Sequence, residues 1–383
     1  MDTAATRNIK YSAFEPVIYL AFELSNIHWR LGFTTGPGRR PRQRTINARD
    51  LIALEDEIRR AKKRFDLTES AGVVSCYEAG RDGFWLHRFL LEQGIENLVV
   101  DSSSIQVNRR ARQAKTDRMD VEKLLSQLIR YRSGERDVWS VVHVPSMEAE
   151  DNRHLHRELK ALKKDRTRHI NRIKSFLVGQ GIRMKVNKDF LEEIERVRKW
   201  DGSALPERLK PRLQREYQRL QLVQKHIKEL ERERVEALRH SEEESVETVR
   251  NLLRLNGIGL NASWMFGMEF FSWRKFNNRK EVGALSGLVP MPHQSGGSYR
   301  EQGISKAGNR HIRGMAIEIA WGWLRYQPES ELTKWYEKKF GHGSKRIRKI
   351  GIVALARKLM IALWRYLETG AIPEGAVLKS RLI

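Results

Sequence analysis

Residues 17–35, VIYLAFELSNIHWRLGFTT, contain two runs that are rich in β-branched, aromatic and other apolar residues. The short turn at Ser25-Asn26 separates the first run from the second. Runs of this length and composition on either side of a turn are typical of adjacent strands. The stretch therefore predicts the first two strands of a sheet near the N-terminal end of the chain.

The following residues alternate between strand-like and helix-like patterns. We expect a third strand after the basic loop at 37–46, helices over 50–65, 82–93 and about 116–130, and strands over 71–78 and 96–102. Three strands followed by alternating helices and strands predict an α/β fold and are compatible with an RNase H-like sheet.

The middle of the chain has a different character. Between residues 150 and 240, leucine and isoleucine recur at helical spacing in two stretches, and lysine, arginine and histidine crowd the intervening positions. This pattern predicts a long antiparallel helical pair, either a coiled coil within the chain or a dimer interface. From residue 242 onward, helices with glycine-rich connections predict a mainly α-helical region, and we expect residues 285–313 to form a polar, glycine-rich loop of the kind that houses chemistry. The expected domains are 1–145, 146–241 and 242–383.

Composition narrows the class of protein. The chain has 383 residues, too many for one ordinary core, and its 40% apolar content excludes a disordered chain. The 72 Lys and Arg residues against 48 Asp and Glu residues give a net charge of +24. So basic a protein needs a polyanion, and nucleic acid is the usual one. A membrane surface is the rival partner, but the sequence shows no apolar anchor and no transmembrane run.

The chain has a single cysteine, Cys76, which excludes disulfides and a cysteine-based zinc site. A reducing cytoplasm fits this composition, and we expect a bacterial, nucleoid-associated protein there.

Four acidic residues stand where strands end or a helix begins. Glu23 ends the first strand, Glu78 ends the fourth, and Asp117 and Asp120 share one face of a helix start. Four carboxylates in one place need cations, and hard oxygen ligands suit Mg²⁺ or Mn²⁺. Two such ions can clamp an in-line phosphoryl transfer. Alternatively, the two aspartates are only a helix cap and a favourable first-turn charge, and Glu78 is an exposed strand end.

Basic residues surround this set. Those expected to hold substrate phosphates are Arg81, Arg109, Arg110, Arg112 and Lys115. Further on, the segment LRLNGIGLNASWMFG resembles a helix–hairpin–helix, in which Gly257 and Gly259 would let backbone N–H groups approach a phosphate. A tight helix–helix turn explains the same two glycines.

Two longer blocks resemble a known family. CYEAGRDGFWLHRFL with VVDSSSIQVNRRARQAKTDRMDVEKLL is similar to the N-terminal DEDD domain of the insertion-sequence one-ten/eleven-eleven transposases. SGLVPMPHQSGGSYREQGISKAGNRHIR is similar to the C-terminal transposase domain of the same family. The blocks lie in the family's order, with a helical insert between them, so the resemblance covers nearly the whole chain.

The resemblance implies a RuvC-like N-terminal domain with a divalent metal held by Glu23, Glu78, Asp117 and Asp120. The DEDD pattern expects aspartate where this chain has Glu23, which places the carboxylate one methylene further from the strand. The family's serine nucleophile falls on Ser295. The implied activity is transposition guided by an element-encoded RNA that pairs with donor and target DNA.

For such a mechanism we expect Ser295 to attack the scissile phosphate and form a phosphoserine bond to DNA. Gly296 and Gly297 would admit the phosphate backbone, while the candidates for binding it are Lys306, Asn309, Arg310 and Arg313. The alternative for Ser295 is an ordinary turn residue. Because strand exchange needs at least two cleaved ends, a homodimer or homotetramer is expected.

Two other functions stay open at this stage. A metal-dependent nuclease or Holliday junction resolvase would use the same acids with water as the nucleophile, and Ser295 would be dispensable. A catalytically inactive nucleic-acid-binding protein would need neither the acids nor the serine.

Overall fold

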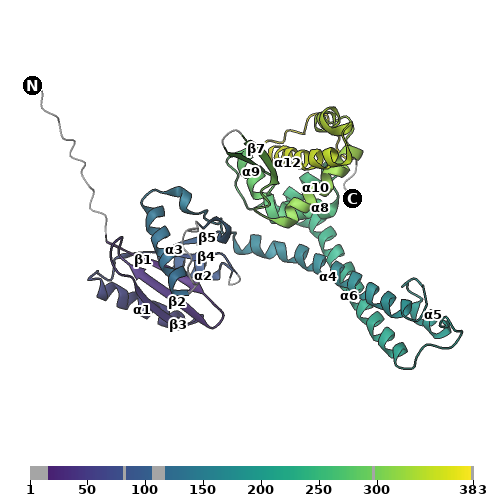
Figure 1. The fold of residues 1–383 in the computed structure, drawn as a ribbon, viewed down its shortest axis with the longest axis horizontal. Helices are drawn as coiled ribbons and strands as arrows, with labels where there is room; N and C mark the ends of the chain where they lie inside the picture. Colours follow the sequence, from purple (N-terminus) through teal and green to yellow (C-terminus); the bar gives the residue numbers. More distant parts are fainter. Residues whose placement is uncertain (1–15, 81–82, 106–116, 296–297, 381–383) are drawn as a thin grey trace, which may run out of the picture. The chain divides into compact units, whose positions relative to one another are not determined.

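The computed structural model describes residues 16–80, 83–105, 117–295 and 298–380 (Figure 1). The chain divides into two compact units, the first ending at Val144 and the second beginning at Pro145. The first unit is α/β and the second is mainly helical, as the sequence predicted. Within the described ranges, no helix combines the length and the apolar character that a membrane span requires.

The first unit contains a five-stranded mixed sheet. Its elements are β1 (Val17–Leu24), β2 (His28–Thr34), β3 (Arg42–Asn47), α1 (Leu51–Arg64), β4 (Gly72–Glu78), α2 (Trp85–Glu92), β5 (Glu96–Val100) and α3 (Asp117–Arg132). The strand order is β3-β2-β1-β4-β5. β1, β2 and β3 pair antiparallel, while β4 and β5 run parallel to β1. The predicted strands and helices of this unit are confirmed.

Helices cover both faces of this sheet. Successive side chains of a strand point to opposite faces, so Leu20 and Phe22 of β1 pack in one core cluster with Leu54 of α1 and Leu86 of α2. Ala21 points the other way, into a second cluster built largely on α3. The apolar content of β1 therefore reflects burial on both faces.

α3 lies unusually close to β2, at a position where the strand has no side chain. A Cβ atom on Gly32 would lie 2.2 Å from Cγ1 of Val121 and 2.9 Å from Cδ1 of Leu125. Real Cβ contacts are never this short, so glycine is required for α3 to lie where it does. Val121 cannot easily turn away, because a β-branched side chain in a helix has one strongly preferred rotamer.

We predict that Gly32→Ala destabilises the first unit by about 1–3 kcal/mol, the range typical of overpacking in a core. Gly72→Ala is the matched control, because its Cβ would make only an ordinary 3.6 Å contact with Val17. Urea unfolding followed by circular dichroism measures both variants. Equal midpoints for the two variants would contradict the close packing of α3.

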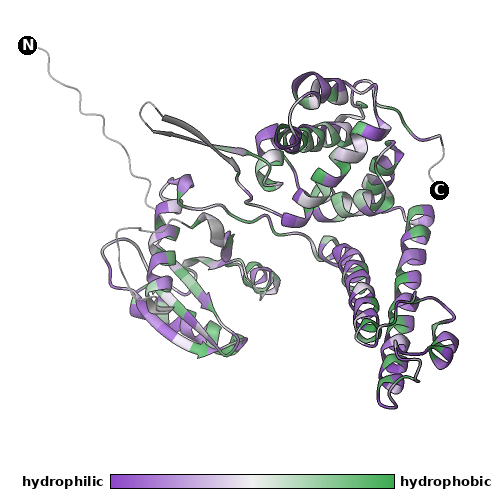
Figure 2. Cartoon of the chain, turned by 45° about the vertical axis from the view of Figure 1, so that its right-hand side comes forward, coloured by the Kyte–Doolittle hydropathy of each residue, from purple (hydrophilic) through white to green (hydrophobic). Residues whose placement is uncertain are grey.

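The second unit begins with two long helices. α4 (Met147–Val178) and α6 (Leu209–His240) lie side by side, joined through α5 (Phe190–Arg196) (Figure 1). Lys163 lies 2.8 Å from Glu231, and Arg172 lies 2.6 Å from Glu216, so the helices run antiparallel. Figure 2 shows hydrophilic residues along much of both helices. The predicted helical pair is therefore present within one chain.

The rest of the second unit is a helical body. Its elements are α7 (Glu244–Arg254), α8 (Leu260–Phe266), a π-helical turn (Gly267–Phe271), α9 (Arg279–Leu285), β6 (Pro290–Ser295), β7 (Ser298–Ile304), α10 (Arg310–Tyr326), α11 (Glu331–Tyr336), a second π-helical turn (Glu337–Gly341) and α12 (Lys345–Thr369). One face of α12 packs in the main core of this body through Leu355, Leu359 and Leu363.

A partly buried polar contact joins α4 to the body. The Arg157 guanidinium donates from Nε and Nη2 to the Glu269 carboxylate, over 2.7 and 2.9 Å. His156, 7% exposed, lies beside this pair. Burial lowers the pKa of His156 to about 4, against the opposing effect of Glu269, and the neighbouring Arg234 and Lys160 lower it further.

This depressed pKa predicts a pH effect on stability. The unfolded chain binds a proton at His156 below about pH 6.5, whereas the folded chain does so only near pH 4. The contribution of neutral His156 to the free energy of unfolding is therefore complete above pH 6.5. About 2 kcal/mol of this contribution is lost between pH 7.5 and pH 5. Urea unfolding at both pH values should show a smaller pH dependence for His156→Gln. An unchanged pH dependence in that variant would contradict the prediction.

Candidate functional site

Glu23 and Glu78 lie side by side at one edge of the sheet. β1 and β4 are parallel neighbours with Phe22 opposite Tyr77, so the next residue of each strand is an acid. Ala21 and Cys76, two residues earlier on these strands, both pack in the α3 cluster. Because side chains alternate along a strand, Glu23 and Glu78 belong to this same face.

α3 brings the third acid toward this edge. The helix begins at Asp117, and Val121, one residue after Asp120, is buried against the sheet. Glu122 accepts a hydrogen bond of 2.7 Å from Gln43 of β3. This contact fixes the position of the first turns of α3 relative to β3. Asp120 is half-buried, whereas the side chain of Asp117 lies outside the described part of the structure.

The acids share a sheet edge without forming a complete metal site among themselves. Within the described ranges, no three Asp, Glu, His or Cys side chains are close enough together to hold a metal ion. Glu23 has an interaction partner of its own in the protein. A metal centre at this edge would therefore require the Asp117 carboxylate, or a shift of the described side chains.

The structure adds an acid that the sequence analysis did not single out. Asp101 directly follows β5, at the same edge of the sheet as the ends of β1 and β4. Ala79 N donates to Val100 O over 2.7 Å, and Ser102 Oγ donates to Ala79 O over 3.0 Å, so the segments after β4 and β5 are tied together. The signal was visible in the sequence as an aspartate at a strand end.

The sequence analysis named five phosphate-binding candidates in the first unit. Arg81, Arg109, Arg110, Arg112 and Lys115 all lie outside the described residues.

Ser295 lies in a β-hairpin, where the sequence analysis expected an irregular loop. β6 and β7 pair antiparallel, with Ser295 opposite Ser298 at the end of the hairpin. The loop expectation was wrong because neither segment has the alternation of apolar residues that usually marks a strand. Only two glycines, Gly296 and Gly297, separate the paired serines in the sequence, and both lie outside the described residues, as does the Ser295 side chain.

Glycines hold the base of this hairpin against the preceding helix. A Cβ atom on Gly287 would lie 2.1 Å from the Ala307 carbonyl oxygen, and one on Gly308 would lie 2.2 Å from the Leu285 carbonyl oxygen. Both glycines have positive φ, at 68° and 83°. The turn before α10 therefore approaches the end of α9 backbone to backbone, which only glycine permits.

The four phosphate-binding candidates lie at this turn, and two of them have structural roles. The Asn309 side chain accepts from the N–H groups of His311 and Ile312 and caps α10. Arg313 Nη1 donates to the Lys306 carbonyl oxygen over 2.9 Å. Lys306 and Arg310 are exposed at the surface. Phosphate binding by these residues stays a prediction.

Gly257 and Gly259 lie in a tight turn between α7 and α8. Gly257 has φ of 85°, and a Cβ there would lie 3.2 Å from Cβ of Tyr326. Lys379 Nζ donates to the carbonyl oxygens of Leu253 and Ile258, which fastens the turn to the C-terminal segment. Packing within the body thus accounts for Gly257, and a phosphate role stays a prediction.

A cavity of about 370 Å³ opens beside the start of α10, lined by His156, Arg157, Lys160, Lys164, Glu269, Asn309 and His311 among others. Lys160 Nζ lies 2.6 Å from His311 Nδ1. An ammonium group can only donate, so this nitrogen of His311 accepts. Burial lowers the pKa of both Lys160 and His311. The sequence analysis missed this cluster, because its members are far apart in the chain.

Comparisons with known proteins find similarity both to the C-terminal body and to the chain as a whole. The family model described as "Transposase IS116/IS110/IS902 family" matches residues 249–334, which include the serine hairpin. The protein named "Putative transposase y4rJ" of Sinorhizobium fredii (strain NBRC 101917 / NGR234) is 39% identical over 377 residues, 95% of each chain.

More distant relatives carry similar names. The "Transposase for insertion sequence element IS1328" of Yersinia enterocolitica is 27% identical over 57% of this chain and 63% of its own length. The protein named "Putative transposase y4qE" of Sinorhizobium fredii is 29% identical over 80% of this chain and 72% of its own length.

The match at 39% identity spans almost the full length of both proteins and is not confined to the C-terminal body. The family expected from the two sequence blocks is thereby confirmed. The chain belongs to the IS116/IS110/IS902 family of insertion-sequence transposases.

Proposed function

We propose that this transposase cuts and exchanges DNA strands through a covalent bond between Ser295 and DNA, assisted by divalent metal at the acidic sheet edge. The observation that carries the proposal is the placement of Glu23 and Glu78 on neighbouring parallel strands, with α3 beginning over the same face. The strand order β3-β2-β1-β4-β5 supports an RNase H-like, RuvC-like interpretation of the sheet.

The donor chemistry at this edge suits a hard cation. Carboxylate oxygens are preferred ligands of Mg²⁺ and Mn²⁺, and the holders would be Glu23, Glu78, Asp117 and Asp120. The described carboxylates do not converge by themselves, so the Asp117 carboxylate or a shift of the described side chains is needed to complete the set. A bound ion would supply positive charge for the phosphorane-like transition state and lower the pKa of an attacking hydroxyl.

Ser295 carries the bond exchange in this proposal. Its hydroxyl group gives up a proton and its oxygen bonds to phosphorus as one phosphorus–oxygen bond of the DNA breaks, and the leaving DNA oxygen takes up a proton, so the step is balanced. A hydroxyl from another strand later reverses the step and frees the serine. Because the bond is stored on the protein, no nucleotide hydrolysis is required. The exposed Lys306 and Arg310 lie near the base of the hairpin and supply positive charge for the phosphate.

DNA ends and target are the substrates, and an element-encoded RNA selects the sequences. Exchange requires two cleaved ends, so at least two copies act together. The helical pair supports an interface role, since Val178 of α4 is 57% exposed, Leu222 of α6 is 54% exposed, and Trp200 between them in the sequence is 80% exposed.

A hydrolytic nuclease or resolvase is the second candidate. The acidic edge lies wholly in the first unit, whereas Ser295 lies in the second. The edge could therefore act on DNA with water as the nucleophile, and the first test below separates the two reactions.

We predict a protein–DNA adduct on a denaturing gel when the full chain meets labelled element-end DNA, Mg²⁺ and RNA from the element's flanking non-coding region. Ser295→Ala and Asp120→Asn should each reduce the adduct by roughly 100-fold or more, as expected for essential groups. Ser298→Ala, at the position paired with Ser295 in the hairpin, and Glu122→Gln, which keeps an oxygen to accept from Gln43, are matched controls that should retain it. Cleavage without an adduct, unaffected by Ser295→Ala, would establish the hydrolytic reaction instead.

Metal binding has a readout that does not depend on activity. An ion that binds only the folded chain raises its melting temperature, with a stabilisation of about 1.4 kcal/mol at ten times Kd. Calorimetry with Mg²⁺ or after chelation should show this shift for the wild type and Glu122→Gln. Asp120→Asn should lose it. No Mg²⁺-dependent shift in the wild type would contradict a metal site at the acidic edge.

A further inference from the structure

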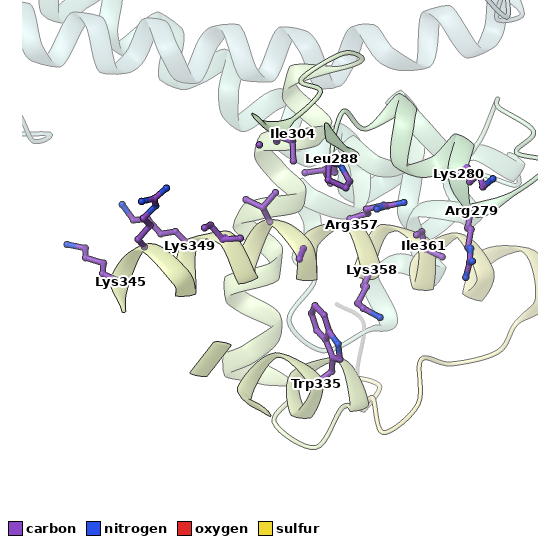
Figure 3. Close-up of a pocket in the computed structure, with 16 residues that line it drawn as sticks. Arg279, Lys280, Leu288, Ile304, Trp335, Lys345, Lys349, Arg357, Lys358 and Ile361 are labelled. Carbon is purple, nitrogen blue, oxygen red and sulfur yellow. The ribbon is translucent and has the colours of Figure 1, made fainter. Parts of the chain in front are cut away.

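A groove of about 990 Å³ crosses the second unit along α12, distant in the sequence from the acidic edge. It lies between α9, the base of the β6–β7 hairpin, α11 and α12 (Figure 3). Pro290 at the start of β6 and Ile304 at the end of β7 line it, so the groove adjoins the hairpin that carries Ser295. We call it the α12 groove.

Cations surround the α12 groove. Seven of its lining residues are lysine or arginine, and none of the described lining residues is acidic. Figure 3 shows Lys345 and Lys349 toward one end of α12 and Arg279 and Lys280 toward the other. Along α4 and α6, in contrast, several cations are paired, as at Glu216, which contacts Arg172 and Arg219. Unpaired like charges repel each other, so this concentration favours an anionic occupant.

The floor of the α12 groove is apolar. Leu288, Ile304, Trp335, Ile350, Val353 and Ile361 line it. On α12 the floor residues recur at helical spacing on the face opposite Leu355 and Leu359, which are in the core. α12 therefore has a second apolar face, flanked by cations, that the body covers only in part, since Val353 and Ile361 are half-buried. Ile350 is 50% exposed.

Two contacts bring charge and aromatic surface to the same place. Lys358 Nζ lies 4.6 Å from the centroid of the Trp335 ring, and Figure 3 shows its side chain directed toward that ring. Arg357 Nε is buried, and it has no hydrogen-bond acceptor among the described residues. A buried donor without an acceptor is costly, and a rotation of the guanidinium toward a phosphate oxygen in the groove would satisfy it.

These features discriminate between polyanions. Duplex nucleic acid presents phosphates, but the faces of its bases are stacked on one another. These faces cannot pack against an apolar aromatic floor. An unpaired strand presents both phosphates and base faces, and proteins that bind such strands combine a basic groove with aromatic side chains. The stretch of α12 from Lys345 to Ile361 spans about 24 Å at 1.5 Å per residue, which accommodates several unpaired nucleotides.

We propose that the α12 groove binds an unpaired nucleic-acid strand, with phosphates on the lysine and arginine rim and bases against Trp335 and the α12 floor. The groove adjoins the base of β6, and the six residues of this β-strand span about 17–20 Å. A nucleic-acid strand held in the groove is therefore directed along the hairpin toward Ser295. The inference rests on the proposed function for its purpose, but binding at the groove does not require cutting.

The test is fluorescence anisotropy of the full chain in EDTA with eight-nucleotide unpaired DNA, the same sequence in RNA, and the corresponding duplex. Trp335→Leu removes stacking, worth about 1–3 kcal/mol per base, so unpaired binding should weaken about 5- to 150-fold with duplex binding unchanged. The triple variant Lys345→Gln/Arg346→Gln/Lys349→Gln should weaken unpaired binding at least tenfold. It should also reduce the slope of log affinity against log salt by about 2, since each phosphate contact on a single strand contributes about 0.7.

The matched control removes three exposed cations from α1: Arg59→Gln/Lys63→Gln/Arg64→Gln. Its affinity for the unpaired strand should stay within about twofold of wild type. Circular dichroism and gel filtration establish that each variant is folded. Comparison of the DNA and RNA arms identifies which strand the groove prefers.

Unchanged octamer affinity in both groove variants would overturn the inference, and so would an equal loss for duplex and unpaired strands. The outcome is separate from that of the serine test. Groove binding without a Ser295 adduct retains this inference and contradicts the proposed chemistry, whereas an adduct without groove binding does the reverse.

Discussion

The close packing of α3 on the sheet is the constraint on which the acidic edge depends. At Gly32 the strand has no side chain, and Val121 and Leu125 occupy the space that a Cβ would need. Asp120 immediately precedes Val121, so any movement of the helix away from the sheet would carry Asp120 away from Glu23 and Glu78. The relation among these acids is therefore set by apolar packing one residue away from them, rather than by contacts among the carboxylates. Such an arrangement suits like charges, which could not hold one another in place.

The same principle recurs at the serine hairpin in the second unit. Gly287 and Gly308 let two backbone segments meet at distances that any side chain would forbid, and the turn between β7 and α10 is fixed as a result. Asn309 then caps α10 and Arg313 donates to the Lys306 carbonyl group. The exposed Lys306 and Arg310 therefore stand on a closely packed backbone turn at the base of the hairpin, and such support is the condition for holding a reacting group in a defined orientation.

The sequence predicted the features that depend on neighbouring residues, but it did not predict those that depend on contacts between distant residues. The strands and helices of the first unit follow from the periodicity of apolar residues, and the acids at the ends of β1 and β4 follow from those strands. The β6–β7 hairpin was expected to be a loop, because its segments PMPHQS and SYREQGI gain their structure from pairing with each other and not from an apolar face. The cavity containing Lys160 and His311 was not foreseen at all, since it joins α4 to the start of α10 across 151 residues of sequence. The family resemblance singled out Ser295 but not this surrounding structure.

The positions of the cations in the structure indicate where an anionic ligand would bind, which the net charge of +24 alone does not. Along α4 and α6 many basic residues have acidic partners, as Lys163 has Glu231 and Arg172 has Glu216. Such pairs produce little net electrostatic potential that could attract an anionic ligand. The cations that line the α12 groove have no acid among its described lining residues, and their mutual repulsion opposes folding in the free protein. An anion that binds there removes this repulsion, so ligand binding and the stability of the second unit must be thermodynamically linked. Part of the excess charge is thus gathered in one groove, which adjoins the hairpin that carries the candidate nucleophile.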